Sequence, residues 1–524
     1  MQWEGRCAGP GRETVKLGIK SVAFAAIVSS ASFAGDFIDT RVAFAVANSN
    51  VFVKPGETTP SEAGTGFGAA KQNTQFYDNF NTRFTGFETL SNISLYKKSP
   101  SFFEGFEAEA ALNVNVLTNP SGAISLFDNA SFVKLNYRPA GWGAKEDISL
   151  TGFPVSADRF RLGYAWKTSW GGDSAFTYNQ GGGLSSTGRP VAVPGAKLQI
   201  TRDRWYAFAG AKTGLLLNGL LNVQERQYGV LAGFGIDLLP NFRLEANGGY
   251  FTRGVIPSLA YLGVRAPVNA LGGSMQLSLF SDNILPSLDL RLYKNDPDVA
   301  SKFFRPETYL GGFSYQLTLE GSFLGQTLAN PERFASTRMQ PAGALALQAR
   351  FKYNFWRFYG IGLMRTLSFI QFDVPGVIPY TDFSNGEKVT PELWFAVGGD
   401  RFLPAQHLTI GLVVGLQSTA SRTSPDLGAG GNNPPPGLLG TRTQVFRNVN
   451  DPSTLPVGDN PVPIFSVKGT FKLDISDYFA ALGEVFYNYD NNRVTFRDSI
   501  DFISQPVFQQ PNQLGFNLVM QARF

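Results

Sequence analysis

The residues of this chain best suited to chemistry are arginines and lysines that recur at alternate positions. In the stretch Arg159-Phe-Arg-Leu-Gly-Tyr-Ala-Trp-Lys167, cations begin and end one file, while Phe160 and Leu162 fall in the other. Alternate residues of a strand point to opposite faces, so the spacing predicts a cationic face backed by an apolar face. A wall lined by one sign of charge concentrates counter-ions, and the chemistry implied is therefore the guidance of anions.

The same alternation assigns further charged residues to the polar faces of other predicted strands. The predicted inward-facing cations are Lys134, Arg138, Arg159, Arg161, Lys167, Arg243, Arg291, Arg350, Lys352, Lys468, Lys472 and Arg523. The acidic residues assigned to the same side are Glu107, Glu109, Glu245, Asp289, Asp474 and Glu484. Twelve cations and six acids give this side a net charge of 12 − 6 = +6. Two interpretations stay open: the cations guide an anionic solute or polymer, or they pair with acids and fill the interior.

The sequence contains few side chains of the types that commonly act in catalysis. The only histidine is His407, in a predicted short turn away from the long loops, and the only cysteine is Cys7. Asp490-Asn-Asn492 offers oxygen ligands but lacks the glycine-bearing register of a calcium loop, so a polar loop is predicted there. We therefore predict no catalytic residue, no metal site and no cofactor, and a protein that is not an enzyme.

Strands of alternating polarity must position these residues, and such strands recur along the chain. Residues 104–117 and 344–355 show the period of two, as do 241–251, 465–475 and 479–490. A lysine or arginine on a lipid-facing side costs about 2–4 kcal/mol at the membrane midplane. The charged face should therefore point inward and the apolar face toward lipid. No apolar run approaches the about 20 residues of a spanning helix.

The connections between these strands alternate in length. Short turns are predicted at 239–241, 403–405 and 475–477, and near Asn354. Long loops, expected to be extracellular, are predicted at about 48–80, 169–190, 325–341, 372–390, 418–464 and 490–512. The predicted fold is an all-β, transmembrane, antiparallel up-and-down β-barrel of about 18 strands, within a range of about 16–20. It forms a single domain over residues 35–524, and the strand parity is ambiguous at 295–310.

The first 34 residues resemble a bacterial export signal. Lys16 and Lys20 precede an apolar stretch at 22–28, and small residues at Ser32 and Ala34 suit cleavage after Ala34. The charged stretch before Val15 is long for such a signal, so Val15 is an alternative start. The mature chain is then expected to begin at Gly35.

The last eleven residues place Leu514, Phe516, Leu518, Met520, Ala522 and Phe524 in one apolar file. This segment resembles the C-terminal signature of Gram-negative outer-membrane β-barrels, whose terminal Phe is read by the insertion machinery. The resemblance implies that Phe524 is an assembly signal. It also implies a multi-pass barrel in the outer membrane, with lipid, lipopolysaccharide and the insertion machinery as partners.

Composition limits the function further. Charged residues make up 16% of the chain, the formal net charge is +4, and no basic block is present; this balance argues against a nucleic-acid partner. The size and cationic lumen are porin-like and similar to exopolysaccharide-export barrels, which implies a conduit for a polar, anionic substrate such as an exported polysaccharide. The alternatives are a general anion-preferring porin and a non-conducting barrel that anchors an envelope-spanning motility or secretion complex. Export or anchoring would involve a periplasmic or envelope partner.

Overall fold

The structure is a computed structural model of the chain. It describes residues 37–48, 50–53, 63–67, 92–118, 124–128, 131–155, 160, 162–163, 193–218, 223–256, 259, 263–281, 312–372, 381–424, 441–447, 452–498 and 504–523. The predicted signal segment 1–34, with Val15 and Gly35, lies outside these ranges. So do the predicted site residues Arg159, Arg161, Lys167, Arg291 and Phe524.

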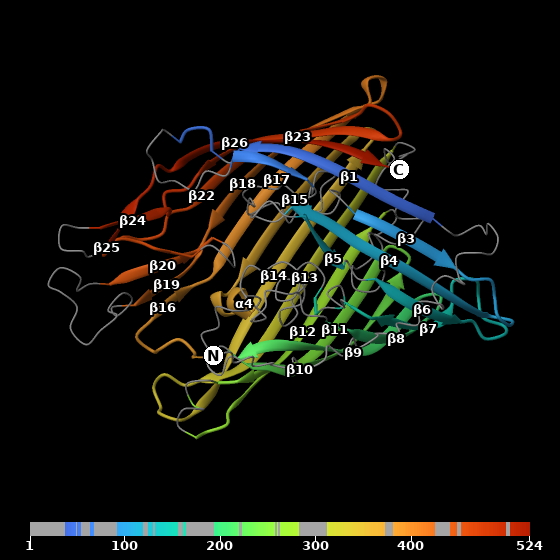
Figure 1. Ribbon diagram of the computed structural model, residues 1–524, viewed down its shortest axis with the longest axis horizontal. Coiled ribbons are helices and arrows are strands. Elements are labelled where there is room, and N and C mark those ends of the chain that lie inside the picture. The colour runs from blue at the N-terminus through green and yellow to red at the C-terminus, as the bar shows by residue number, and fades with distance from the viewer. Residues whose placement is uncertain are drawn as a thin grey trace, which may run out of the picture.

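The described residues form an antiparallel sheet that closes on itself (Figure 1). Each wall strand pairs with the next in chain order, and β1 pairs with both β3 and the final strand β26. The sheet has 20 strands, and removing the accessory strands β2 (Ala63–Phe67) and β5 (Ile124–Asp128) leaves 20 − 2 = 18 in the ring. The wall strands are β1 (Phe37–Asn48), β3 (Asn92–Lys98), β4 (Phe106–Thr118), β6 (Phe132–Tyr137), β7 (Asp147–Phe153), β8 (Gly195–Thr201), β9 (Trp205–Asn218), β10 (Val223–Leu239), β11 (Phe242–Val255), β12 (Pro267–Phe280), β13 (Phe313–Ala329), β14 (Thr337–Tyr353), β15 (Trp356–Arg365), β17 (Glu392–Leu403), β18 (Leu408–Ser418), β22 (Ile464–Asp474), β23 (Phe479–Tyr489) and β26 (Asn512–Arg523). The predicted barrel of about 18 strands is confirmed.

Side chains of the wall alternate between an apolar outer face and a polar inner face. In β12, Leu271 and Met275 are exposed by 61% and 53%, whereas Ser274 and Gln276 between and beside them are buried. Closed barrels satisfy every wall hydrogen bond without an edge, which lipid requires. The exposed apolar face is therefore the lipid-facing surface, and the protein is an outer-membrane-type β-barrel. Among the described residues, no helix is long and apolar enough to cross a membrane.

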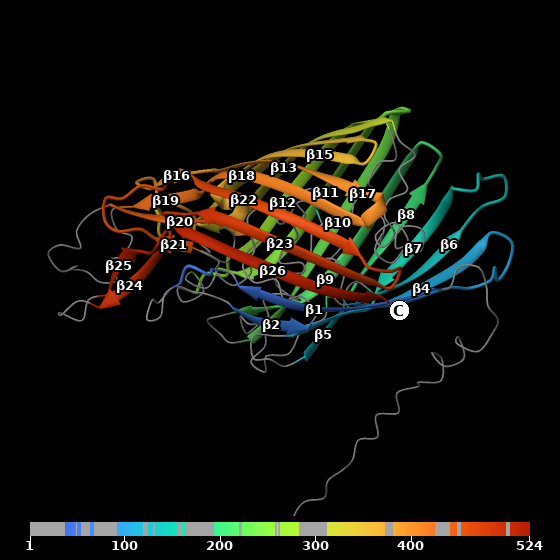
Figure 2. The same ribbon diagram turned by 90° about the horizontal axis from the view of Figure 1, so that it is seen from above.

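The two ends of the barrel differ in their connections. One end carries tight turns, including those between β10 and β11, β14 and β15, β17 and β18, and β22 and β23, at the predicted positions. The C-terminus lies at this short-turn end (Figure 2). The predicted loop 325–341 is wrong in extent, because β13 continues to Ala329 and β14 begins at Thr337. The ambiguous segment 295–310 lies outside the described residues.

Extra sheets extend from the opposite, long-loop end (Figure 2). A four-stranded sheet contains β16 (Lys388–Thr390), β19 (Ala420–Ser424), β20 (Arg442–Phe446) and β21 (Pro452–Thr454). A separate hairpin joins β24 (Val494–Asp498) to β25 (Ser504–Phe508). The helix α4 (Leu367–Phe372) follows β15, and a single 3-10 turn, η4 (Pro404–Gln406), joins β17 to β18.

Candidate functional site on the inner face of the barrel

Several predicted inward-facing cations do lie on the inner face. Lys134 of β6 stands between the exposed residues Val133 and Leu135, and its register partners are Glu109 and Thr151. No ion pair joins Lys134 to an acid in the described part of the chain. Lys134 is thus a partly exposed cation on the inner wall.

Other predicted cations are neutralised by acids on the same or a neighbouring strand. Arg243 Nε lies 2.5 Å from Asp237 Oδ1. Lys468 Nζ is 3.4 Å from Glu484 Oε2 on the neighbouring strand β23. Lys472 Nζ is 2.8 Å from Asp474 Oδ1. These contacts belong to the interpretation in which ion pairs fill the interior, and they reduce the charge available to a passing anion.

A cationic group remains near the short-turn end of β14 and β15. Arg350 faces Tyr359 across the two strands, and Lys352 faces Arg357 in the next row. All four side chains are partly exposed. The only hydrogen bond of the Arg350 guanidinium within the described residues is a long one, 3.5 Å from Nη2 to Gln348 Oε1. Arg350 therefore keeps its charge without a carboxylate neighbour.

Arg138 was predicted to line the interior, but it does not belong to a wall strand. It lies beyond the end of β6 and is exposed in the turn toward β7, where its backbone N–H donates to the carbonyl oxygen of Gly105 at 2.7 Å. The predicted inward and outward alternation of side chains does not apply to Arg138, because β6 ends at Tyr137.

The sequence analysis missed several charged residues of the inner face. Lys197 and Lys212 are buried on β8 and β9, and the acids Glu320 and Glu392 are buried on β13 and β17. The signal was available, since Lys197 alternates with Ala196 and Leu198 on the opposite face. These residues bring two cations and two acids, so they leave the net charge of the predicted set unchanged.

A segment between β7 and β8 packs against the inside of the wall. Phe160 and Leu162 are fully buried in a cluster with inward-facing residues of β9 to β14, among them Leu231 and Phe251. The sequence analysis placed Phe160 and Leu162 on a lipid-facing strand, and that prediction is wrong. The apolar patch of the inner wall, rather than lipid, covers them.

Hydrogen bonds and glycines fit this segment to the wall. Lys212 Nζ donates to the carbonyl oxygen of Phe160 at 2.7 Å, and the Gly163 N–H donates to Asn247 Oδ1 at 3.0 Å. A Cβ atom at Gly272 would lie 2.8 Å from Leu162 Cδ2. The wall thus provides one hydrogen-bond donor, one acceptor and space for Phe160, Leu162 and Gly163.

A second segment folds onto the inner face between β15 and β16. Phe369 of α4 joins the same apolar cluster. Farther along, Asp382 forms an ion pair with Arg338 of β14 and accepts a hydrogen bond from Gln340 Nε2 at 2.6 Å. The Asp382 N–H donates to the carbonyl oxygen of Ala329 at 3.0 Å. Both inward segments therefore occupy the β9–β14 side of the interior.

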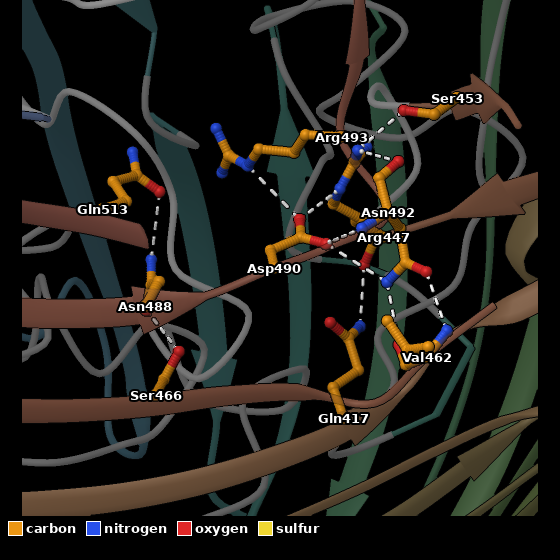
Figure 3. Close-up of polar contacts among 10 residues, drawn as sticks. All are labelled: Gln417, Arg447, Ser453, Val462, Ser466, Asn488, Asp490, Asn492, Arg493 and Gln513. Atoms are coloured by element: carbon orange, nitrogen blue, oxygen red, sulfur yellow. Dashed lines mark hydrogen bonds and ion pairs between the residues drawn. The ribbon is translucent and has the colours of Figure 1, made fainter. Parts of the chain in front are cut away.

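A buried polar network holds the outer loops at the long-loop end (Figure 3). Arg447 Nε lies 2.5 Å from Asp490 Oδ2, and both side chains are buried. Gln417 Nε2 donates to the Arg447 carbonyl oxygen at 2.8 Å and to Glu392 Oε1 at 2.6 Å. Arg365 Nε extends the network, because it lies 2.5 Å from Glu392 Oε2. The network links three wall strands to the connections that follow β20 and β23.

The residues considered for catalysis and metal binding have other surroundings. His407 is exposed and ends η4 in a left-handed conformation, with φ at 51°. Asp490 accepts hydrogen bonds from Arg447, Arg493 and Asn492. Within the described ranges, no group of three or more His, Cys, Asp or Glu side chains is arranged to hold a metal.

Aromatic side chains divide between the two faces. Trp356 and Phe358 are exposed on the lipid side near the short-turn end, and Phe355 is exposed in the adjacent turn, as expected for an interfacial girdle. Tyr206 and Tyr359 lie on the inner face, where Tyr206 donates to Glu245.

No protein-family model and no curated protein matches this chain. Solved structures resemble it over most of their length. An anion-selective porin from Comamonas acidovorans gives a TM-score of 0.40 at 11% identity, covering 93% of this chain and 99% of the other. OpdQ of Pseudomonas aeruginosa gives 0.42 at 8%, covering 94% and 97%. OmpT of Vibrio cholerae gives 0.37 at 7%, covering 94% and 99%. At such scores, the fold assignment rests on the strand pairing described above.

Proposed function

We propose that this protein is an outer-membrane channel for small polar solutes that favours anions. The observation that carries the proposal is a polar inner face, inside a closed barrel, on which neither Lys134 nor Arg350 forms an ion pair within the described part of the chain. A low-dielectric wall of one local sign raises the concentration of counter-ions. Barrels of this strand number leave an aqueous interior unless segments fill it.

The inward segments favour small solutes over a polymer. Phe160, Leu162 and α4 occupy one side of the interior and are anchored there by buried apolar contacts. A polysaccharide would need a wide continuous path past both segments. Neither polysaccharide export nor the anchoring of a motility or secretion complex gains support from the resembling structures. The general anion-preferring porin is accordingly the alternative that the proposal adopts.

A planar-bilayer experiment tests the proposal. Under a KCl gradient, the reversal potential should report chloride preference, and the double variant Lys134→Gln/Arg350→Gln should shift it toward cations. The preference should shrink with salt, because the Debye length falls from about 10 Å at 0.1 M to about 3 Å at 1 M. Replacing the ion-paired Lys472 with Gln is the matched control and should change the preference less. Cation preference in the wild type would overturn the anionic part, and an absence of conductance would overturn the channel itself.

A further inference from the structure

The neighbours of Arg350 on the inner face are polar on one side and apolar on the other. Toward the short-turn end, Lys352 and Arg357 form the next row. Toward the long-loop end, Ile361 and Leu363 of β15 belong to a cluster with Trp394, Ala396 and Val413 of the next two strands. The charge of Arg350 thus lies at the border between a cationic row and an apolar patch.

Tyr359 connects the two regions. It is the direct register partner of Arg350, and it packs against the edge of the apolar cluster. A Cβ atom at Gly398 would lie 2.5 Å from Tyr359 Cε2. The tyrosine ring therefore lies against the backbone of β17, and the glycine is the residue that permits this close approach. The ring presents a partly exposed apolar surface beside a guanidinium.

We infer that Arg350 and Tyr359 form a binding subsite for amphiphilic organic anions, which carry one charged head group and a short apolar body. The inference rests on the proposed channel function and names its solute class. The head group forms charge-assisted hydrogen bonds with Arg350, with Lys352 and Arg357 adding favourable charge. The apolar body lies along the Tyr359 ring at the edge of the patch, because Trp394 and Val413 are already buried.

Two neighbouring features set the limits of the subsite. Asp400 faces Arg357 across β15 and β17 and lowers the charge of that row. Arg350 has no such acid opposite it, since its register partners are Gln316 and Tyr359. A single head group at Arg350 is therefore favoured over a dianion that spans both rows.

Equilibrium dialysis of radiolabelled octanoate tests the subsite without relying on conduction. The full-length protein is placed in phosphatidylcholine nanodiscs, and empty nanodiscs supply the blank. Octanoate should bind saturably to the wild type, and unlabelled octyl sulfate should compete, whereas acetate and octanol should compete at least tenfold more weakly. Arg350→Gln should weaken octanoate binding at least tenfold. Tyr359→Ala should weaken binding of octanoate and leave the weak binding of acetate unchanged.

Lys472→Gln is the matched control, because Lys472 is an inner-face cation that pairs with Asp474 and lies outside the apolar patch, and it should bind octanoate like the wild type. Heat-modifiable migration of each variant verifies the barrel. Equal octanoate binding by Arg350→Gln and the wild type would overturn the subsite, as would equal competition by octanol. These results separate the subsite from the channel: a protein that binds octanoate at Arg350 yet conducts no chloride would refute conduction alone.

Discussion

The ammonium group of Lys212 lies 2.7 Å from the carbonyl oxygen of Phe160, and this contact joins the inner face of β9 to the segment after β7. Both residues are buried, with Lys212 exposed by 2% and Phe160 by 0%. A buried ammonium is costly unless it is hydrogen-bonded. The contact therefore has two effects: it stabilises the buried ammonium group of Lys212, and it holds Phe160 against the inner face of the wall.

Replacing Lys212 with Met should loosen the segment and enlarge the channel. The variant keeps the apolar stem but leaves the Phe160 carbonyl without its donor, a loss of about 1–3 kcal/mol. Single-channel recording should show a higher and more variable conductance than the wild type, with an intact barrel by heat-modifiable migration. Lys472→Met is the comparison, since Lys472 pairs with Asp474 and does not contact the segment. An unchanged conductance in the Lys212 variant would show that Phe160, Leu162 and Gly163 do not limit the path.

A methyl group at Gly272 should disturb the same region by overpacking. Its Cβ atom would lie 2.2 Å from Leu324 Cδ2 and 2.8 Å from the Phe323 carbonyl oxygen. The backbone oxygen cannot move easily, so Gly272→Ala should destabilise the barrel by about 1–3 kcal/mol. Gly321→Ala on the neighbouring strand is the control, because nothing lies within 4 Å of its Cβ position. Urea unfolding in nanodiscs, followed by gel migration, would measure both; equal midpoints would contradict the packing argument.

The barrel wall could be predicted from the sequence, whereas the segments that pack against its inner face could not. In β26, Leu518 and Met520 are exposed and Asn517 and Gln521 are buried, as the alternation predicted. The same alternation at Phe160 and Leu162 has another cause, because an apolar inner wall substitutes for lipid. Period two separates two faces but does not say what covers each face.

Site prediction failed in a related way. Lys468 and Lys472 were correctly assigned to strands, but their pairing with Glu484 and Asp474 depends on side-chain geometry as well as register. The sequence therefore identified some of the inward-facing basic residues, but it did not show which of them are neutralised by an ion pair. That distinction depends on which acids lie within ion-pair distance of each cation.

The Arg447–Asp490 pair should control the order of the outer loops. Arg447→Met would leave Asp490 buried with Asn492 as a neutral donor and with the more distant Arg493, whose Nε lies 3.2 Å away, as its cation. Removing one partner of a buried pair costs about 3–5 kcal/mol, and here the cost falls on the connections after β20 and β23. Limited proteolysis should cleave residues 448–463 or 490–511 faster in Arg447→Met, with the barrel core retained. Arg493→Met, which leaves the 2.5 Å pair intact, should show less cleavage; equal rates in the two variants would contradict this.

Phe524 should be needed for efficient assembly. The residue lies outside the described part of the chain, but β26 before it places Leu518 and Met520 on the lipid side and closes the ring against β1. Phe524→Ser should reduce the amount of heat-modifiable protein in the outer membrane, whereas Phe496→Ser in the outer hairpin should not. Normal amounts of inserted Phe524→Ser protein would refute the assembly signal.

Acid should release the turn between β6 and β7 through Glu146. The Gly143 N–H, 2.7 Å from Glu146 Oε2, is the main cause that holds the pKa of this carboxyl below its ordinary value of 4.5; the Asp203 N–H and Arg202 add to it. A carboxyl whose pKa is lowered by folding stabilises the folded state above its ordinary pKa, and this contribution is lost as pH falls through the lowered value.

The guanidinium of Arg202 also lies 4.1 Å from the centre of the Trp142 ring. Trp142 fluorescence, isolated by subtracting the Trp142→Phe spectrum, should therefore be constant at neutral pH and change below about pH 4.5. Glu146→Gln should show the acid-state spectrum already at pH 7, and Asp147→Asn, next in sequence, should titrate like the wild type. A Glu146→Gln spectrum identical to that of the wild type at pH 7 would show that this carboxylate does not hold the turn.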